Sequence, residues 1–279
     1  ANPSAEPNAM SFPGIGWVAM HSSLADAKRA SLFFKSSPMG SYNHNHADQN
    51  AFVLHKAGQS ILTSSGVYDY YGSPHWLAWY KTTQAHNAVT FDGGQGQSLG
   101  VSGRGISSAN GKIIRFEQGA DWALSTGDAT AAYLGIMSKA LRTVSLLEGR
   151  YAIVLDSLAS SSSHQFELNF HTDSAPMPVG TSYVIRGTAC MRSYSNVALQ
   201  VQTKAVVAPT PTGITWTPNW VTRVSNAAPT NDLSVVTVVD LACSAESAVK
   251  PTYSQGNWTI TTPKHSLNFA TATHTVTFK

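Results

Sequence analysis

Short runs rich in β-branched and aromatic residues, separated by turn sequences, recur along the whole chain. Runs of this kind predict strands, and the Gly-, Asn- and Asp-containing segments between them predict tight turns. No long segment has apolar residues at helical spacing, so the only helix we expect is a short one over 23–30. Many strands joined by turns favour an all-β fold in which large antiparallel sheets pack face to face as a sandwich.

Local patterns predict the individual strands. They are expected at 16–20, 31–35, 51–55, 60–63, 87–91, 142–147, 151–155, 164–171, 198–202, 233–241, 258–260 and 274–278. In 164–171 the apolar residues Phe166, Leu168 and Phe170 alternate strictly with polar ones. Strict alternation indicates one dry and one wet face. The wet face would comprise Gln165, Glu167, Asn169 and His171.

The chain has 279 residues, a length that a single all-β domain can reach. We predict one antiparallel β-sandwich domain over 1–279, because no convincing boundary or internal repeat is visible. The Pro- and Thr-rich segment 208–213 is a loop at which two β layers could separate. Residues 1–7 have the character of a linker and not of a signal peptide, so we expect the chain to begin partway through a longer protein.

Composition limits the function classes. Charged residues make up 12% of the chain, against roughly 25% in an ordinary soluble domain, and the net charge is +3. Without a basic block, nucleic acid is not expected as a partner, and no apolar run approaches the roughly 18 residues of a membrane span. Cys190 and Cys243 either form a disulfide or are two buried thiols. Low charge with abundant Ser, Thr, Asn and Trp favours secretion or the periplasm of a bacterial cell.

Residue types suited to chemistry crowd into three groups between residues 41 and 97. The group 41–50 holds His44 and His46, which would point the same way on an extended backbone. The group 66–75 holds three tyrosines, and the group 84–97 holds a further histidine, His86. Histidine can act as a base or a metal ligand, tyrosine can transfer a proton, and amides bind sugar hydroxyls. These groups favour sugar chemistry with proton transfer.

A purely structural interpretation competes with this one. Histidines in a β protein are more often structural than catalytic, and the tyrosines Tyr68, Tyr70 and Tyr71 can equally be explained by packing within their loop. The aromatic residues that follow are candidates for stacking on sugar faces. They are Trp76, Trp79 and Tyr80.

The order of these motifs resembles the heparinase II/III-like carboxy-terminal domain. The similarity rests on residues 46–52, on Gly66-x-Tyr68 and on 85–93, which occur in the same order in that family. It covers roughly residues 10–175, and the strands predicted in 176–279 would complete the sheets. The finer resemblance is to the alginate and oligoalginate lyases of that group. It is carried by 44–50, 70–74 and 85–97.

The resemblance implies a polysaccharide lyase that cleaves alginate or oligoalginate by β-elimination at a 4-O-linked uronate. In such enzymes an (α/α) toroid precedes the β domain, and this chain has no room for one. The toroid would be supplied in cis or as a separate chain, and the partner would be an acidic polysaccharide. The implied catalytic residues are His44 and Tyr70. The implied substrate-binding residues are Asn43, Gln49, Tyr71, His75 and Trp79.

The resemblance also implies a zinc ion or another divalent metal, held by a His, an Asp and a second His. His46 and His86 match the two histidines, but Ser64 stands at the expected Asp position, and a neutral Ser is a poor replacement for a carboxylate. Asp48 or Asp69 then replaces it, or the metal is weakly held or absent. Two other functions stay open, namely a glycosaminoglycan lyase of the same family and a non-catalytic carbohydrate-binding β module.

Overall fold

The computed structural model describes residues 3–38, 44–99 and 108–278, where 21 strands form four antiparallel sheets. Within these ranges no helix is long and apolar enough to cross a membrane. The all-β prediction is confirmed. The helical segments described are η1 (Pro3–Ala5), η2 (Trp76–Tyr80), η3 (Thr83–Ala85) and η4 (Thr130–Tyr133).

Each sheet is named here by a letter. Sheet A has the order β1-β2-β3-β4-β5, with strands Ala9–Phe12, Trp17–His21, Ala30–Lys35, Ala51–Lys56 and Gln59–Leu62. Sheet B has the order β15-β16-β11-β6, with strands Leu199–Ala205, Trp220–Asn226, Phe166–Thr172 and Val89–Phe91. Sheet C has the order β12-β13-β14-β17-β10-β9-β8-β7, with strands Met177–Val179, Ser182–Ile185, Ala189–Ser195, Thr230–Asp240, Tyr151–His164, Met137–Leu147, Trp122–Asp128 and Lys112–Gln118. Sheet D has the order β18-β19-β20-β21, with strands Thr252–Ser254, Asn257–Thr261, Ser266–Ala270 and Thr275–Phe278.

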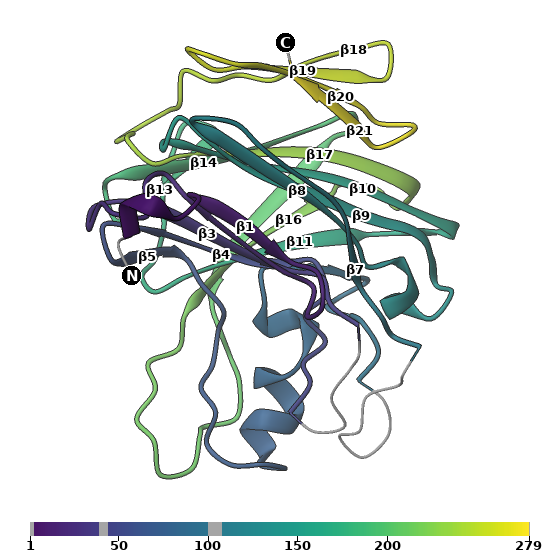
Figure 1. Ribbon diagram of the computed structural model, residues 1–279. Helices are drawn as coiled ribbons and strands as arrows, with labels where there is room; N and C mark the ends of the chain where they lie inside the picture. The colour runs from purple at the N-terminus through teal and green to yellow at the C-terminus, as the bar shows by residue number, and fades with distance from the viewer. Residues whose placement is uncertain (1–2, 39–43, 100–107, 279) are drawn as a thin grey trace.

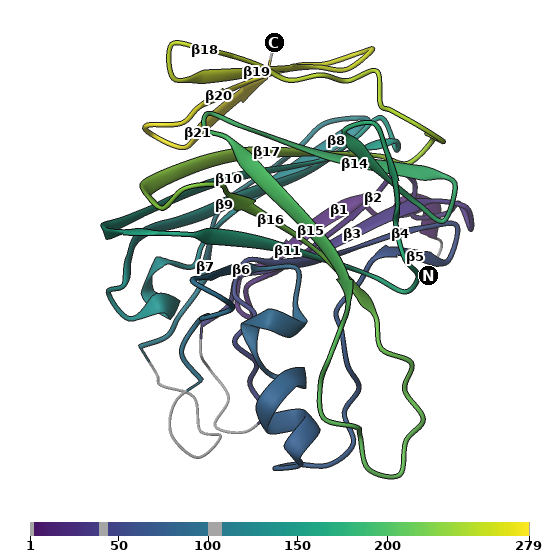
Figure 2. The same cartoon turned by 180° about the vertical axis from the view of Figure 1, so that it is seen from behind.

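Sheet C lies in the middle of the fold. Sheet D covers one of its faces, and sheets A and B lie on the other, joined by an antiparallel bridge between Thr63 and His171 (Figures 1 and 2). Strand β10 shows the reason, because it is buried on both sides. Val154 belongs to the core shared with sheets A and B, whereas Ile153 and Leu155 belong to the core shared with sheet D. A near-continuous apolar strand is what a doubly covered sheet requires.

The segment 44–50 that leads into β4, the segment after β5 and the β15–β16 loop lie together with η2 at the end of the molecule opposite sheet D (Figure 1). Arg142 of β9 holds this region against the central sheet. Its guanidinium pairs with Asp156 at 2.8 Å, and its Nη1 donates to the carbonyls of Asn50 and Asn87 at 2.9 and 2.6 Å. Asn50 ends the segment 44–50, which carries His44 and His46, and Asn87 directly follows His86. One buried cation therefore holds both histidine-bearing segments to the central sheet.

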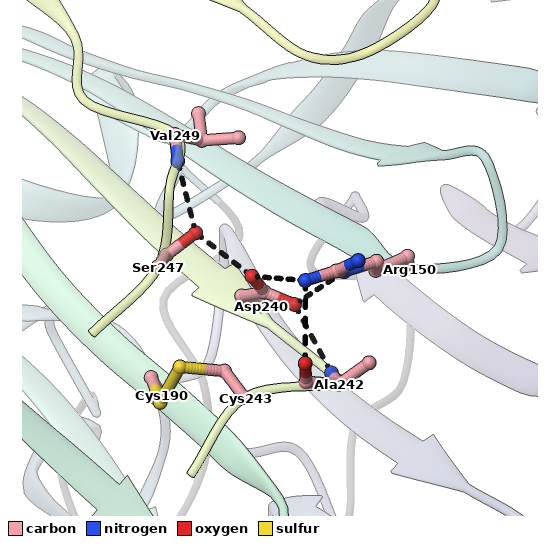
Figure 3. Close-up of a disulfide and its surroundings, with 7 residues drawn as sticks. All are labelled: Arg150, Cys190, Asp240, Ala242, Cys243, Ser247 and Val249. Carbon is pink, nitrogen blue, oxygen red and sulfur yellow. Dashed lines mark hydrogen bonds and ion pairs between the residues drawn. A yellow bond between two sulfur atoms is a disulfide. The ribbon is translucent and has the colours of Figure 1, made fainter. Parts of the chain in front are cut away.

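Cys190 and Cys243 form a disulfide between β14 and the segment after β17 (Figure 3). Beside it, Arg150 pairs with the buried carboxylate of Asp240 at 2.8 Å. The Asp240 carboxylate also accepts a hydrogen bond from Ser247, so the turn after β17 is held by both a covalent and an ionic link (Figure 3). This resolves the alternative between a disulfide and two free thiols.

Two sequence-based predictions about connections are wrong. Residues 23–30 form turns and not a helix, because this segment must reverse the chain between β2 and β3. The Ser22 N–H donates to the Ala30 carbonyl and closes that reversal. The loop containing 208–213 does not separate two layers either. It joins β15 to β16, which are hydrogen-bonded neighbours in sheet B.

The wet face predicted for 164–171 is also wrong. Every residue of β11 is buried, including Glu167, Asn169 and His171 at 3%, 0% and 0% exposure. The alternation itself is present, since Leu168 and Phe170 face the core. The polar side is covered by groups that lie over it: Arg223 bonds Glu167 and Asn169, and the side-chain oxygen of Asn87 contacts His171.

Candidate active site

The segment 44–50 lies between β3 and β4 and is held at its base by amide groups. The Ser37 N–H donates to Gln49 Oε1 at 2.7 Å. The Gln49 N–H donates to Gln97 Oε1 at 2.8 Å, and Gln97 Nε2 donates back to the Gln49 carbonyl at 2.7 Å. Gln49 is 1% exposed. Gln49, which is predicted to bind substrate, is therefore internal and holds two loops together. Asn43, which directly precedes this segment and is also predicted to bind substrate, lies outside the described residues.

His44 is exposed and lies among tyrosines. Its φ of +62° takes the chain out of the extended conformation, so His44 and His46 do not point the same way as predicted. The His44 ring lies 5.5 Å from the Tyr68 ring and 5.2 Å from the Tyr71 ring, centroid to centroid. His44 and these tyrosines form an exposed aromatic cluster on the loop end of the fold.

Tyr70 is 48% exposed and is carried by a tightly held turn. The carboxylate of Asp69 accepts hydrogen bonds from the Ser73 hydroxyl, from the Tyr70 N–H and from the Thr212 N–H. These hydrogen bonds outweigh the effect of partial burial and lower the pKa of Asp69 to about 2. Asp69 thus fastens the tyrosine loop to the β15–β16 loop.

His75 and Trp79 are internal. His75 is 0% exposed, with Nδ1 2.6 Å from the Pro209 carbonyl and Nε2 accepting from the Val67 N–H at 3.3 Å. The Trp79 indole N–H donates to the Ser65 hydroxyl at 3.1 Å. Of the residues predicted to bind substrate, Tyr71 lies at the surface beside His44, whereas these two hold the loops together.

His46 and His86 meet beneath the exposed cluster. His46 Nδ1 lies 3.2 Å from His86 Nε2, and His86 Nδ1 lies 3.1 Å from the Ser64 hydroxyl. Asp48 completes the group, because its carboxylate and the two imidazole nitrogens all lie within 4.8 Å of one another. The Asp48 carboxylate also pairs with the ammonium of Lys35, at the end of β3.

Burial sets the protonation states of this group. It lowers the pKa of His86 to about 4 and lowers the pKa of His46 as well. Burial alone would raise the pKa of Asp48, but the Lys35 ammonium overcomes it and holds that pKa below its usual value. At neutral pH the cluster therefore offers two neutral imidazoles and one carboxylate, which are the forms that ligate metals.

These residues fit a divalent ion. The 3.2 Å between the two imidazole nitrogens matches the edge of about 3.3 Å expected in a tetrahedral site with Zn–N bonds of 2.0–2.1 Å. Ser64 bonds the second nitrogen of His86, as an outer-shell partner does in metal sites. A hollow of about 130 Å³, lined in part by Asp48, Ser64 and His86, leads to the cluster.

Several residues of this site were not predicted. In the sequence, Lys35 is only the end of a predicted strand, and Gln97 only part of a Gly- and Gln-rich segment. Tyr80, which the sequence offers as a candidate for stacking on a sugar face, lies edge-on to His46, with ring centroids 4.8 Å apart. Of the two carboxylates considered as replacements at the metal position, the geometry brings Asp48 into the cluster, while Asp69 is engaged in its own turn.

The sequence profile of the heparinase II/III-like C-terminal domain matches residues 5–261. The chain belongs to this family. A heparinase III structure superposes with a TM-score of 0.71 at 14% identity, covering 97% of this chain and 41% of the other. The heparan sulfate lyase HepC of Pedobacter heparinus superposes with a TM-score of 0.67 at 16% identity, covering 97% and 42%.

The heparinase-like chain thus spans about two fifths of the length of these structures. At such identities the superpositions show the shared fold. No curated protein matches it in sequence. The predicted membership of the heparinase II/III-like family is confirmed, whereas a particular closeness to alginate lyases is not shown by these matches.

Proposed function

We propose that this chain is the C-terminal part of a polysaccharide lyase that cleaves an acidic, uronate-containing polysaccharide by β-elimination. The observation that carries the proposal is the exposed cluster of His44 with Tyr68 and Tyr71, with Tyr70 beside it on the same loop. Family membership supplies the reaction class. An (α/α) toroid, in cis or as a separate chain, would form the opposite wall of the cleft.

The reaction requires two proton transfers. A base removes the C5 proton of the uronate, the electron pair forms the C4–C5 double bond, and the O4 leaving group takes a proton from an acid. We assign the proton transfers on this side of the cleft to His44 and Tyr70. Tyr71, packed on the His44 ring, would position the sugar at the cleavage point.

We further propose that His46, Asp48 and His86 hold a zinc ion or a similar divalent cation. When bound, the ion would supply fixed positive charge under the loop that carries His44. Neutral imidazoles and a carboxylate suit such an ion. His44 and Tyr70 would perform the chemistry, and the His46–Asp48–His86 cluster would hold the segment that carries His44.

For the substrate, we favour a glycosaminoglycan over alginate. Two solved structures that share the fold are named as heparinase III and heparan sulfate lyase, which supports the glycosaminoglycan class. Alginate is the second candidate, supported by the motifs at 44–50, 70–74 and 85–97. The disulfide supports an oxidising compartment, so we propose secretion or the periplasm.

The test uses the full-length protein that contains this chain, with heparan sulfate, chondroitin sulfate and alginate as separate substrates. Release of unsaturated uronate is followed by its ultraviolet absorbance. We expect turnover of at least one polymer, and we expect His44→Ala to lower kcat by about 10²–10⁴-fold. The control is His55→Ala, because His55 lies on β4 outside the site.

Two results would contradict the proposal. Absence of unsaturated product with every polymer would remove the lyase assignment. If His44→Ala weakened binding of the polysaccharide but product never formed in either protein, a non-catalytic carbohydrate-binding module would be the better description.

A further inference from the structure

The side of sheet B that faces away from the core carries a groove that the candidate active site does not use. Figure 2 shows the strand order β15-β16-β11 across this sheet. The register places Gln200 beside Ser225 and Ser225 beside Glu167, and in the next row Gln202 beside Arg223 and Arg223 beside Asn169. The groove has a volume of about 330 Å³. It is lined by Gln165, Glu167, Gln200, Val201, Gln202, Arg223 and Ser225.

Arg223 is held rigidly in the floor of this groove. Its Nη1 donates to Glu167 at 3.2 Å and its Nε donates to Asn169 Oδ1 at 3.1 Å. Glu167 is fixed in turn by the Thr90 hydroxyl at 2.7 Å and by the Gly93 N–H at 3.0 Å. Among the residues that the structure describes, none accepts a hydrogen bond from the second terminal nitrogen, Nη2. A pre-organised guanidinium with a donor to spare is suited to bind a carboxylate or sulfate.

A second hollow of about 110 Å³ adjoins the groove and shares Arg223 with it. Lys204 and Gln84 contribute polar groups to it. Its apolar floor is formed by the buried residues Val206, Val221 and Trp79, and Val207 at its edge is 91% exposed. Lys204 is exposed and makes no ion pair within the described part of the chain. Arg223 and Lys204 carry two positive charges against the one negative charge of Glu167, so the combined surface is net positive.

We propose that this surface, from Gln200 to Trp79 by way of Arg223, is a second binding site for an acidic oligosaccharide. The side-chain amides of Gln165, Gln200 and Gln202 would bind sugar hydroxyls. Arg223 Nη2 and Lys204 would bind carboxylate or sulfate groups. The exposed side chain of Val207, at the edge of this hollow, would contact the C–H face of a sugar ring.

The site connects with the candidate active site through the chain. Trp79 and Gln84 come from η2 and η3, and His86 directly follows η3. A polymer bound on sheet B would thus lie against the segment that holds His86. The inference rests on the proposed function for the class of polymer, but it does not require that the protein cleave it.

The test is calorimetric titration of heparan sulfate and alginate oligosaccharides into the full-length protein carrying His44→Ala, which prevents turnover during the titration. The double change Gln202→Ala with Lys204→Ala removes exposed side chains and spares the partly buried Arg223–Glu167 pair. We expect it to weaken binding of the acidic oligosaccharides about tenfold, as the loss of one charged and one neutral hydrogen bond implies. Arg223→Lys keeps a positive charge next to the Glu167 carboxylate but has no group in place of Nη2. It is expected to weaken binding to a similar extent.

The control is Lys250→Ala, which removes another exposed positive charge, from the segment that joins sheets C and D. It should change the affinity less than twofold, by about the size of a surface charge effect. Thermal melting of every variant establishes that it is folded. Equal affinities in the groove variants and the control would overturn the inference, and so would equally tight binding of a neutral glucan.

Failure of this inference and failure of the proposed function are distinguishable. Acidic oligosaccharides that bind at the groove without any release of unsaturated product would support the second site and remove the lyase. Product release with groove variants that bind as the wild type does would support the lyase and overturn the second site.

Discussion

At the residue scale, two histidines only two positions apart have different roles. The prediction that His44 and His46 point the same way assumes an extended backbone, and the positive φ of His44 breaks that assumption. His44 is left exposed among tyrosines, while His46 turns inward to His86. The sequence could place both in one motif-bearing segment. The sequence could not show that the two side chains point in different directions, because His44 packs on Tyr68 and Tyr71, which lie more than 20 residues further along the chain.

Lys35 is expected to control how tightly the His46–Asp48–His86 cluster binds a divalent ion. Its ammonium pairs with the same carboxylate that a metal would use, and it repels a cation placed there. We predict that Lys35→Met binds zinc about tenfold more tightly than the wild type, measured by competition with a chelating dye. The metal-free variant should also melt at a lower temperature, because Asp48 loses the one ion-pair partner it has among the described residues.

Lys35→Arg is the matched variant for this prediction, since it keeps the positive charge and should leave zinc affinity close to that of the wild type. Asp48→Asn should abolish the effect of zinc on the melting temperature in both backgrounds. Weaker zinc binding by Lys35→Met would show that Lys35 orients Asp48 for the metal and does not compete with it.

At the element scale, the pattern of apolar residues predicts β9, β10 and β17 of sheet C, but misses the inner strands β14 and β16 and several connections. The run at 151–155 was predicted, and it forms part of β10, where burial on both faces demands apolar residues throughout. Strands β7 and β8 were missed because their charged and small residues weaken the strand signal. The burial of Glu167 could not be predicted either. It depends on Arg223, which comes from a strand that is 56 residues away in sequence.

The interface between sheets C and D contains a buried histidine that should make the protein sensitive to acid. His274 precedes β21, with Nε2 3.0 Å from the Thr143 hydroxyl and Nδ1 2.8 Å from the Ser157 hydroxyl. Burial, aided by the charges of Lys139 and Arg115, lowers its pKa to about 3. In the unfolded chain its pKa returns to the ordinary value of about 6.5. The unfolded state therefore binds more protons between these two pH values, and stability falls as the pH falls through this window.

We predict that His274→Gln removes part of this sensitivity. Glutamine can still bond the two hydroxyls but gains no charge in acid. The free energy of unfolding in urea should fall more steeply for the wild type than for His274→Gln as the pH is lowered from 6.5 to 4. The difference should reach about 2–3 kcal/mol, since each fully developed pH unit contributes about 1.4 kcal/mol. Parallel pH profiles for the two proteins would contradict this assignment.

At the scale of the whole molecule, three sheets meet at one buried ion pair. Arg142 and Asp156 lie on adjacent strands of sheet C and are both 1% exposed. Through the carbonyls of Asn50 and Asn87, Arg142 also reaches the residues that lead into β4 of sheet A and β6 of sheet B. The candidate active site is therefore positioned by the way the layers pack as much as by its own loops.

Removing one partner of this pair should be costly. We predict that Arg142→Met lowers the free energy of unfolding by about 3–5 kcal/mol, because it leaves the Asp156 carboxylate buried without a counter-charge. The double variant Arg142→Met with Asp156→Leu removes both charges. It should recover a large part of that loss in urea unfolding, since a buried ion pair can be replaced by apolar groups at small net cost.

The double variant should regain stability without regaining the metal affinity of the candidate site. In the double variant the carbonyls of Asn50 and Asn87 still lack the donor that fixes both histidine motifs. We therefore expect zinc affinity at the His46–Asp48–His86 cluster to stay below that of the wild type, even where the double variant is almost as stable. Zinc affinity that returned together with stability would show that Arg142 serves folding alone. Affinity that stayed low would show that the central sheet positions the site through this one guanidinium.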